Sequence, residues 1–216
     1  MRPFRRLPLV LCCLVPLLAV PCGGDSTPPP TPDDALAAKN ALLAVADFPA
    51  GWTLSDAARS GSSPLEKCRD AKTGKNQTGE AESGSFGNGP ASVRQTVLVY
   101  RSSSDAVAAM DSLANELGCA VNLMNSGKAE TDEASVSGAV AGTVPAPVVG
   151  DRTNAYRIKF HIALKASKAE ADGYIDVIYV QSGRSIVGLV ASNAYDPLAS
   201  DVLNPLTSKA AAKLPK

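Results

Sequence analysis

Histidine, tryptophan and other aromatic residues are scarce in this 216-residue sequence. It has one histidine, His161, one tryptophan, Trp52, and 5% aromatic residues. No Gly-x-Ser-x-Gly motif is present to expose a serine, and a serine nucleophile needs a base, for which His161 is the single imidazole. The composition therefore favours a non-enzymatic protein, with an extracytoplasmic hydrolase that uses His161 as the alternative.

An excess of positive charge is also lacking. The chain has 21 basic and 21 acidic residues. Removal of Arg2, Arg5 and Arg6 with the N-terminal segment leaves 21 minus 3, or 18, basic residues against the 21 acidic ones. No basic cluster stands out, which excludes nucleic acid as a partner. With one histidine and no Cys-x-x-Cys spacing, we expect no metal site and no cofactor.

Residues 1–21 are typical of a bacterial secretion signal. Met1 to Arg6 carries three arginines, and Leu7 to Val20 is an apolar run of 14 residues. A membrane-spanning helix needs roughly 20 apolar residues, so this run is short for a permanent anchor. We expect the remaining chain to work outside the cytoplasm.

Cys22 opens a segment typical of mature bacterial lipoproteins. It precedes two glycines and a Pro/Thr-rich stretch that reaches residue 33, which we interpret as a tether. A diacylglyceryl group on Cys22 would hold the protein at the membrane. The preceding Ala19, Val20 and Pro21 depart from the lipobox pattern, so a secreted protein cleaved nearby and a retained signal anchor remain alternatives.

The cysteines predict one disulfide. Of the five, Cys12 and Cys13 lie in the signal and Cys22 is the lipidation candidate. Cys68 and Cys119 remain, and in an oxidising compartment they are expected to pair with each other. Metal ligation is the competing use of these thiols.

Helical spacing of apolar residues and capping residues predicts four helical segments. Gly118 is expected to end the third helix, so that Cys119 follows it directly. Asn204-Pro205 is expected to interrupt the fourth. The segments are a helix from Asp33 or Asp34 to about Ala46, a short turn at 64–70, a helix at 102–118, and a C-terminal helix opened by Asp196-Pro197.

Alternating apolar residues predict an antiparallel sheet. The last two strands meet across the turn Ser182-Gly183, and the final strand is apolar on both faces, so it should be central. His161 should point outward with Arg157 and Lys159. Residues 56–90 are rich in Gly, Ser, Lys and Asn and are expected to form a long loop apart from the turn at 64–70. The predicted strands are 93–101, 134–140, 156–164, 173–181 and 184–192.

The fold class is therefore α+β, an antiparallel β-sheet with helices packed against it. A single domain at 34–216 follows the signal peptide at 1–21 and the tether at 22–33. Trp52 is expected to fill the edge of the core, with contact to a ligand as its other use.

Several short motifs resemble a known family. The segments 46–53, 97–102 and 150–157, with an Ala-rich helix that ends near Cys119, are similar to actinobacterial lipoproteins. Those proteins resemble the extracellular sensor domain of mycobacterial Ser/Thr kinases and, more loosely, PsbP-like domains. The resemblance covers residues 34–214 and implies a disulfide-stabilised domain that binds a ligand or partner outside the cell.

We therefore expect a lipid-anchored binding protein of the cell envelope. Its partners would be the membrane, through the N-terminal lipid, and an unidentified small molecule, lipid or protein. The sequence does not identify that ligand.

Overall fold

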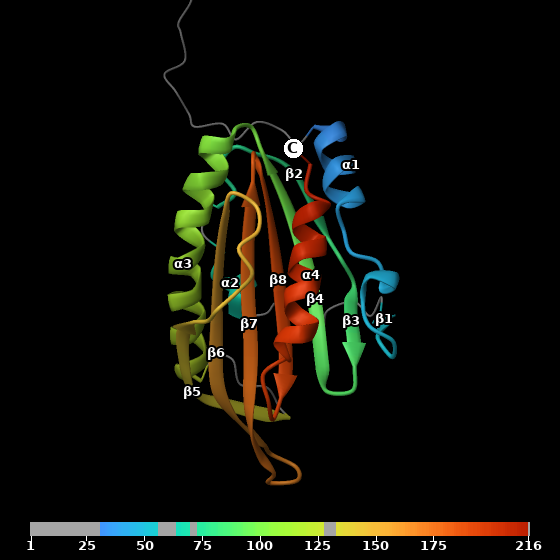
Figure 1. Cartoon of the computed structure of the whole chain (residues 1–216). Helices are drawn as coiled ribbons and strands as arrows, with labels where there is room; N and C mark the ends of the chain where they lie inside the picture. The colour runs from blue at the N-terminus through green and yellow to red at the C-terminus, as the bar shows by residue number, and fades with distance from the viewer. Residues whose placement is uncertain (1–30, 56–63, 70–72, 128–132, 216) are drawn as a thin grey trace, which may run out of the picture.

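The computed structural model describes residues 31–55, 64–69, 73–127 and 133–215. The signal, Cys22 and most of the tether lie outside the described residues. Figure 1 shows one antiparallel sheet with α4 in front of it and α2 behind it. The elements are α1 (Pro32–Asn40), a 3-10 turn (Val45–Asp47), β1 (Thr53–Ser55), α2 (Pro64–Lys67), β2 (Gln77–Glu82), β3 (Ser85–Asn88), β4 (Ala91–Tyr100), α3 (Ser103–Asn125), β5 (Ala134–Thr143), β6 (Arg152–Leu164), β7 (Glu170–Ser182), β8 (Ser185–Ala194) and α4 (Ser200–Ala212).

The fold class predicted from the sequence is confirmed. The strand order is β1-β3-β4-β8-β7-β6-β5, with β2 paired to β4, and all pairs are antiparallel. As predicted, β8 is central, between β4 and β7. The hairpin turn is Gly183-Arg184, one residue later than expected, because Ser182 pairs with Ser185.

The two faces of the sheet carry different cores. On one face, which we call the α4 face, Val97, Val187 and Leu189 pack with α1 and α4. On the other, the α3 face, Leu98, Ile186 and Ile158 pack with α3. Neighbouring strand residues point to opposite faces, so these strands contribute to both cores.

The predicted loop at 56–90 is wrong in its second half, where β2 and β3 form. Their sequences lack the apolar alternation of a half-buried strand, because β2 is a polar edge strand and β3 buries one large side chain, Phe86. α1 approaches β2 closely at Gly79, where a β-carbon would lie 2.5 Å from the backbone of Asp34. This close contact requires glycine in a strand that would otherwise favour larger residues. Residues 56–63 and 70–72 lie outside the described residues.

The predicted end of α3 at Gly118 is also wrong, because the helix continues to Asn125. Gly118 is exposed and its missing side chain meets nothing within 4 Å, while Ala120 and Met124 extend the buried stripe of the helix. Burial of that stripe outweighs the roughly 1 kcal/mol that an internal glycine costs. Val107 and Ala114, which lie at helical spacing with the apolar residues of this helix, are exposed.

The first and last helices also differ from the prediction. Thr31 caps α1, which ends at Asn40, and a separate 3-10 turn covers Val45–Asp47. α4 begins at Ser200 and runs through Pro205 without interruption. Proline removes one backbone hydrogen bond, and the burial of Leu203, Leu206 and Ala210 against the sheet offsets that loss.

Two buried polar side chains attach α1 and the segment after it to the sheet. Gln95 in β4 is 1% exposed, and its amide accepts from the Leu43 N–H at 2.6 Å and donates to the Ala41 carbonyl at 3.2 Å. Asp34 in α1 forms a two-pronged ion pair with Arg184 in the β7–β8 turn, at 2.5 and 2.9 Å. The hydrogen bonds from Arg184 lower the pKa of Asp34 well below its usual range.

We predict that Asp34→Asn destabilises the protein in a pH-dependent way. Because folding lowers the pKa of Asp34, its carboxylate stabilises the folded state above about pH 4, and this contribution is lost as the pH falls further. Loss of the charged hydrogen bonds should lower the free energy of unfolding by about 2 kcal/mol at pH 7. Urea unfolding at several pH values measures the difference from wild type, which should shrink below about pH 4.

Asp33→Asn is the matched control, because Asp33 lies next to Asp34 in the first turn of α1 and is exposed. It should change the free energy of unfolding by no more than about 0.5 kcal/mol. Equal losses in the two variants would contradict the assigned role of the Asp34–Arg184 pair.

Candidate functional site

The α3 face contains two adjoining pockets between the sheet, α3 and α2. Their cavity volumes are about 120 Å³ and about 200 Å³, and they share Leu65, Arg94 and Val190. We call them the polar lobe and the apolar lobe. An apolar cavity of about 150 Å³ admits a benzene-sized molecule, so the lobes suit a small ligand.

The apolar lobe is lined mainly by hydrocarbon. Its side chains come from α2, α3, β4, β6, β7 and β8. Two of its polar residues, Ser92 and Ser192, are hydrogen-bonded to each other at 2.7 Å. The other lining residues of this lobe are Pro64, Ala120, Met124, Ile158 and Ile175.

The polar lobe combines an apolar floor with charged side chains. Leu98, Leu113 and Ile186 form the floor. The charged residues are Arg69, Glu82, Arg94 and Glu116, two of each sign. Arg69 binds Glu80 at 2.7 Å with its side chain 39% exposed, whereas Glu116 is 6% exposed.

A hydrogen-bond network fixes Glu116 beneath the pocket. Thr73 donates to the carboxylate of Glu116 and shares a 2.9 Å hydrogen bond with Ser112. The Thr73 carbonyl accepts from the Tyr100 hydroxyl at 2.8 Å. Buried polar groups of this kind are costly unless they are satisfied, and this network satisfies the carboxylate.

Gly188 makes room for the pocket in the centre of the sheet. It lies opposite Tyr179 on β7 and Thr96 on β4. A β-carbon at this position would lie 3.1 Å from the Tyr179 ring, so the absence of a side chain lets the ring lie across β8. A glycine in a central strand often marks such a close approach, and the sequence offered no further sign of it.

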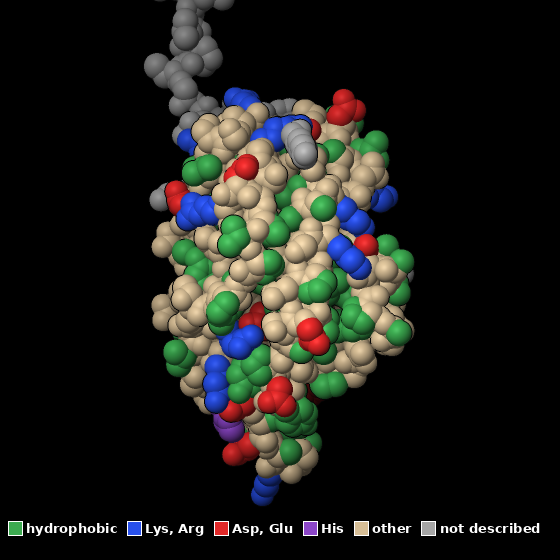
Figure 2. Space-filling view, viewed as in Figure 1, with side chains coloured by type: hydrophobic (Ala, Val, Ile, Leu, Met, Phe, Trp, Pro, Cys, Tyr) green, Lys and Arg blue, Asp and Glu red, His purple; other side chains and the backbone are tan. Residues whose placement is uncertain are grey.

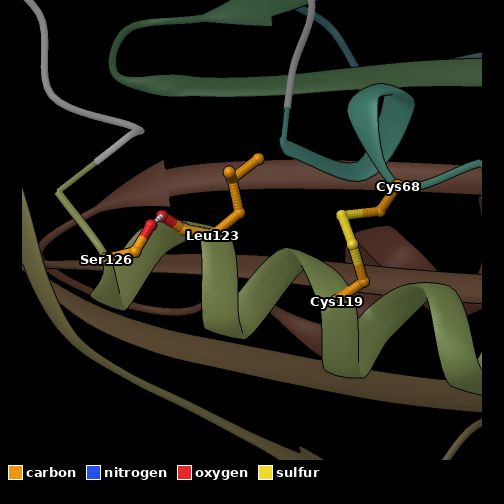
Figure 3. The surroundings of a disulfide bond; sticks show 4 residues. All are labelled: Cys68, Cys119, Leu123 and Ser126. Carbon is orange, nitrogen blue, oxygen red and sulfur yellow. Dashed lines mark hydrogen bonds between the residues drawn. A yellow bond between two sulfur atoms is a disulfide. The ribbon is translucent and has the colours of Figure 1, made fainter.

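The disulfide between Cys68 and Cys119 is present, as predicted, with sequence separation 51. Figure 3 shows that it joins the residue after α2 to the C-terminal part of α3. Cys119 lies one turn before Leu123, whose carbonyl accepts a hydrogen bond from the Ser126 hydroxyl. We had predicted from Gly118 that Cys119 directly follows the end of the helix. That prediction is wrong, because Cys119 lies within α3. Leu65 and Arg69 lie on either side of Cys68 and line the pocket, so the bridge holds this part of the pocket wall on α3.

Trp52 lies away from the two lobes. It is 7% exposed in the core of the α4 face, with its ring 5.2 Å from that of Phe48. This position agrees with the expected core role. Trp52 does not line either lobe, so its contact with a ligand stays a prediction.

His161 lies at an exposed position on β6, as predicted from its strand pattern. Figure 2 views the α4 face, where the histidine side chain lies among acidic residues near the lower end. Its side chain is 42% exposed, with Nε2 3.5 Å from Glu170 and Nδ1 3.8 Å from Asp172. Ser137 on β5 pairs with His161 across the sheet, but no hydrogen bond joins them among the described residues. The pairing of Ser137 with His161 therefore does not supply the hydrogen-bonded nucleophile and base of a hydrolase.

A third cavity, of about 290 Å³, lies on the α4 face beside the start of α4. Its charged residues, Arg157 and Asp176, are bonded to each other at 2.7 and 3.2 Å, and Asp176 is 1% exposed. The two charged residues of the third cavity therefore bind each other.

Comparison with known proteins gives a structural similarity. The crystal structure of the extracellular domain of PknH from Mycobacterium tuberculosis is similar to this chain. The TM-score is 0.48 at 12% sequence identity, over 83% of this chain and 95% of that chain. This is the kind of domain that the sequence motifs resemble. No protein-family model and no curated protein sequence matches.

No helix among the described residues is long and apolar enough to cross a membrane. Within the same residues, no group of three or more His, Cys, Asp or Glu side chains is placed to hold a metal ion.

We predict that replacing both Cys68 and Cys119 with serine destabilises the domain. Removing the constraint on a loop of 51 residues should lower the free energy of unfolding by about 4 kcal/mol on the chain-entropy model. Urea unfolding gives the loss. Wild-type protein treated with dithiothreitol should behave like the double variant, and a loss below about 1 kcal/mol would contradict a stabilising role for the bridge.

Proposed function

We propose that this protein is an exported, lipid-anchored and non-enzymatic binding protein of the cell envelope. Its ligand would enter the two lobes on the α3 face. The observation that carries this proposal is the pair of adjoining lobes, in which apolar side chains predominate and a few polar groups are held in fixed positions. Such a lining is what small-molecule sites share.

A core formed for stability alone would be filled more completely. Protein interiors leave few voids larger than a water molecule, and each missing contact lowers stability. On the α3 face, two adjoining lobes stay open beside Glu116, Arg94 and Arg69. This open space next to fixed polar groups supports a binding role for the α3 face.

The disulfide supports the same role. α2 is a four-residue helix, too short to be stable by itself. Its link to α3 keeps Leu65 and Arg69 at the pocket, which reduces the ordering that a ligand would otherwise have to cause.

We predict that Val190→Trp abolishes binding of the neutral fluorescent probe N-phenyl-1-naphthylamine. Val190 lines both lobes and is half-buried, so an indole there would fill the space between them. Probe fluorescence during titration measures the dissociation constant, which should rise at least tenfold relative to wild type. Thermal unfolding followed by circular dichroism checks that the variant is folded.

Val140→Trp is the matched control, because it introduces the same side chain at a position that is 67% exposed on β5. It should bind the probe as the wild type does. Equal probe binding in folded Val190→Trp and wild-type protein would overturn the assignment of the site to the α3 face.

We predict that Cys22 carries the lipid anchor. In an actinobacterial host, the wild-type protein should fractionate with membranes, and its intact mass should match a chain that begins at Cys22 with a diacylglyceryl group. Cys22→Ser should appear in the soluble fraction, whereas Cys13→Ser, within the apolar run, should stay with the membrane. Release of the wild-type protein without a lipid mass would contradict the anchor.

A further inference from the structure

The charged residues of the polar lobe already have interactions within the protein. Arg69 is bound to Glu80, and the nearby Glu82 and Glu116 add further negative charge around its guanidinium. Arg94, Glu82 and Glu116 each have an interaction partner. An ionic ligand would have to break one of these interactions or enter without a counter-charge, and either is costly in a partly desolvated site.

Tyr179 differs from the other polar residues of the lobe. Its side chain lines the lobe, and its hydroxyl makes no hydrogen bond with the described residues. Its ring is held across β8 by the space at Gly188. Burial raises the pKa of Tyr179, so the hydroxyl keeps its proton and can donate it to an oxygen acceptor.

The adjoining apolar lobe suits hydrocarbon. Met124, Ile158 and Ile175 line it, and its two serines share a hydrogen bond. Arg94, which also lines the polar lobe, is its charged residue. Apolar groups placed there would gain about 25 cal/mol for each Å² removed from water.

We infer that the ligand is an uncharged amphiphile, which places its hydrocarbon in the apolar lobe and an oxygen acceptor at the Tyr179 hydroxyl. This inference rests on the proposed function and specifies its ligand class. An alcohol, an ester or an amide with an aliphatic or aromatic tail has this chemistry. A fatty acid and an alkylammonium ion share the tail and lack the uncharged head.

Three eight-carbon compounds with straight hydrocarbon tails test the charge preference. In competition with N-phenyl-1-naphthylamine on the wild-type protein, 1-octanol should bind at least tenfold more tightly than octanoate or octylammonium. If either ion binds as tightly as 1-octanol, the inferred ligand class is wrong, but the assignment of the binding site to the two lobes is not contradicted. If neither the probe nor any of the three binds, the proposed function fails with it.

Tyr179→Phe tests the hydrogen bond, because it keeps the ring over Gly188 and removes the hydroxyl. The affinity for 1-octanol should fall about fivefold, the effect of losing one neutral hydrogen bond. Affinity for naphthalene, which has no polar group, should stay unchanged and serves as the internal control for packing. A change in 1-octanol affinity below twofold, with naphthalene binding intact, would overturn the role of Tyr179.

Discussion

The burial of β8 on both of its faces is the constraint on which the rest of the structure depends. Val187, Leu189 and Ala191 point into the core beneath α4, while Ile186 and Val190 point toward α3. A strand in this position has to be paired on both edges and covered on both sides, because otherwise its apolar residues would be exposed to water. β4 and β7 supply the pairing, and the helices supply the cover.

The helices that cover the two faces of the sheet pack in different ways, and the candidate site follows from that difference. α4 packs on the sheet together with α1, whose position is fixed by Gln95 and by the Asp34–Arg184 pair. On the other face, α3 covers the sheet beside a short α2 that is attached through Cys68. A long helix crossing a wide sheet leaves space at its side, and the lobes occupy that space.

The sequence predicted the long elements well because their signals were local. The alternation in β6, β7 and β8 follows from the pleat of a strand, and residues such as Ile158 and Val177 lie where that pattern put them. The disulfide followed from counting cysteines. β2 was missed because its place depends on contact between Gly79 and α1, which no local pattern records. The extension of α3 beyond Gly118 was missed for a related reason, since only the sheet beneath it makes Met124 a buried residue.

The lobes could not be predicted, because their residues are distant in sequence and each has an ordinary role alone. Leu65 lies in a short turn, Glu116 in a helix and Gly188 in a strand, and no local sequence pattern marks any of them as part of a site. The fold brings them together around Tyr179. A fold optimised for stability alone would replace Glu116 and its network with hydrocarbon, because a buried carboxylate needs several partners to offset its desolvation. Polar groups kept beside an open apolar space exceed what stability requires, and this excess is the physical argument that the α3 face binds a ligand.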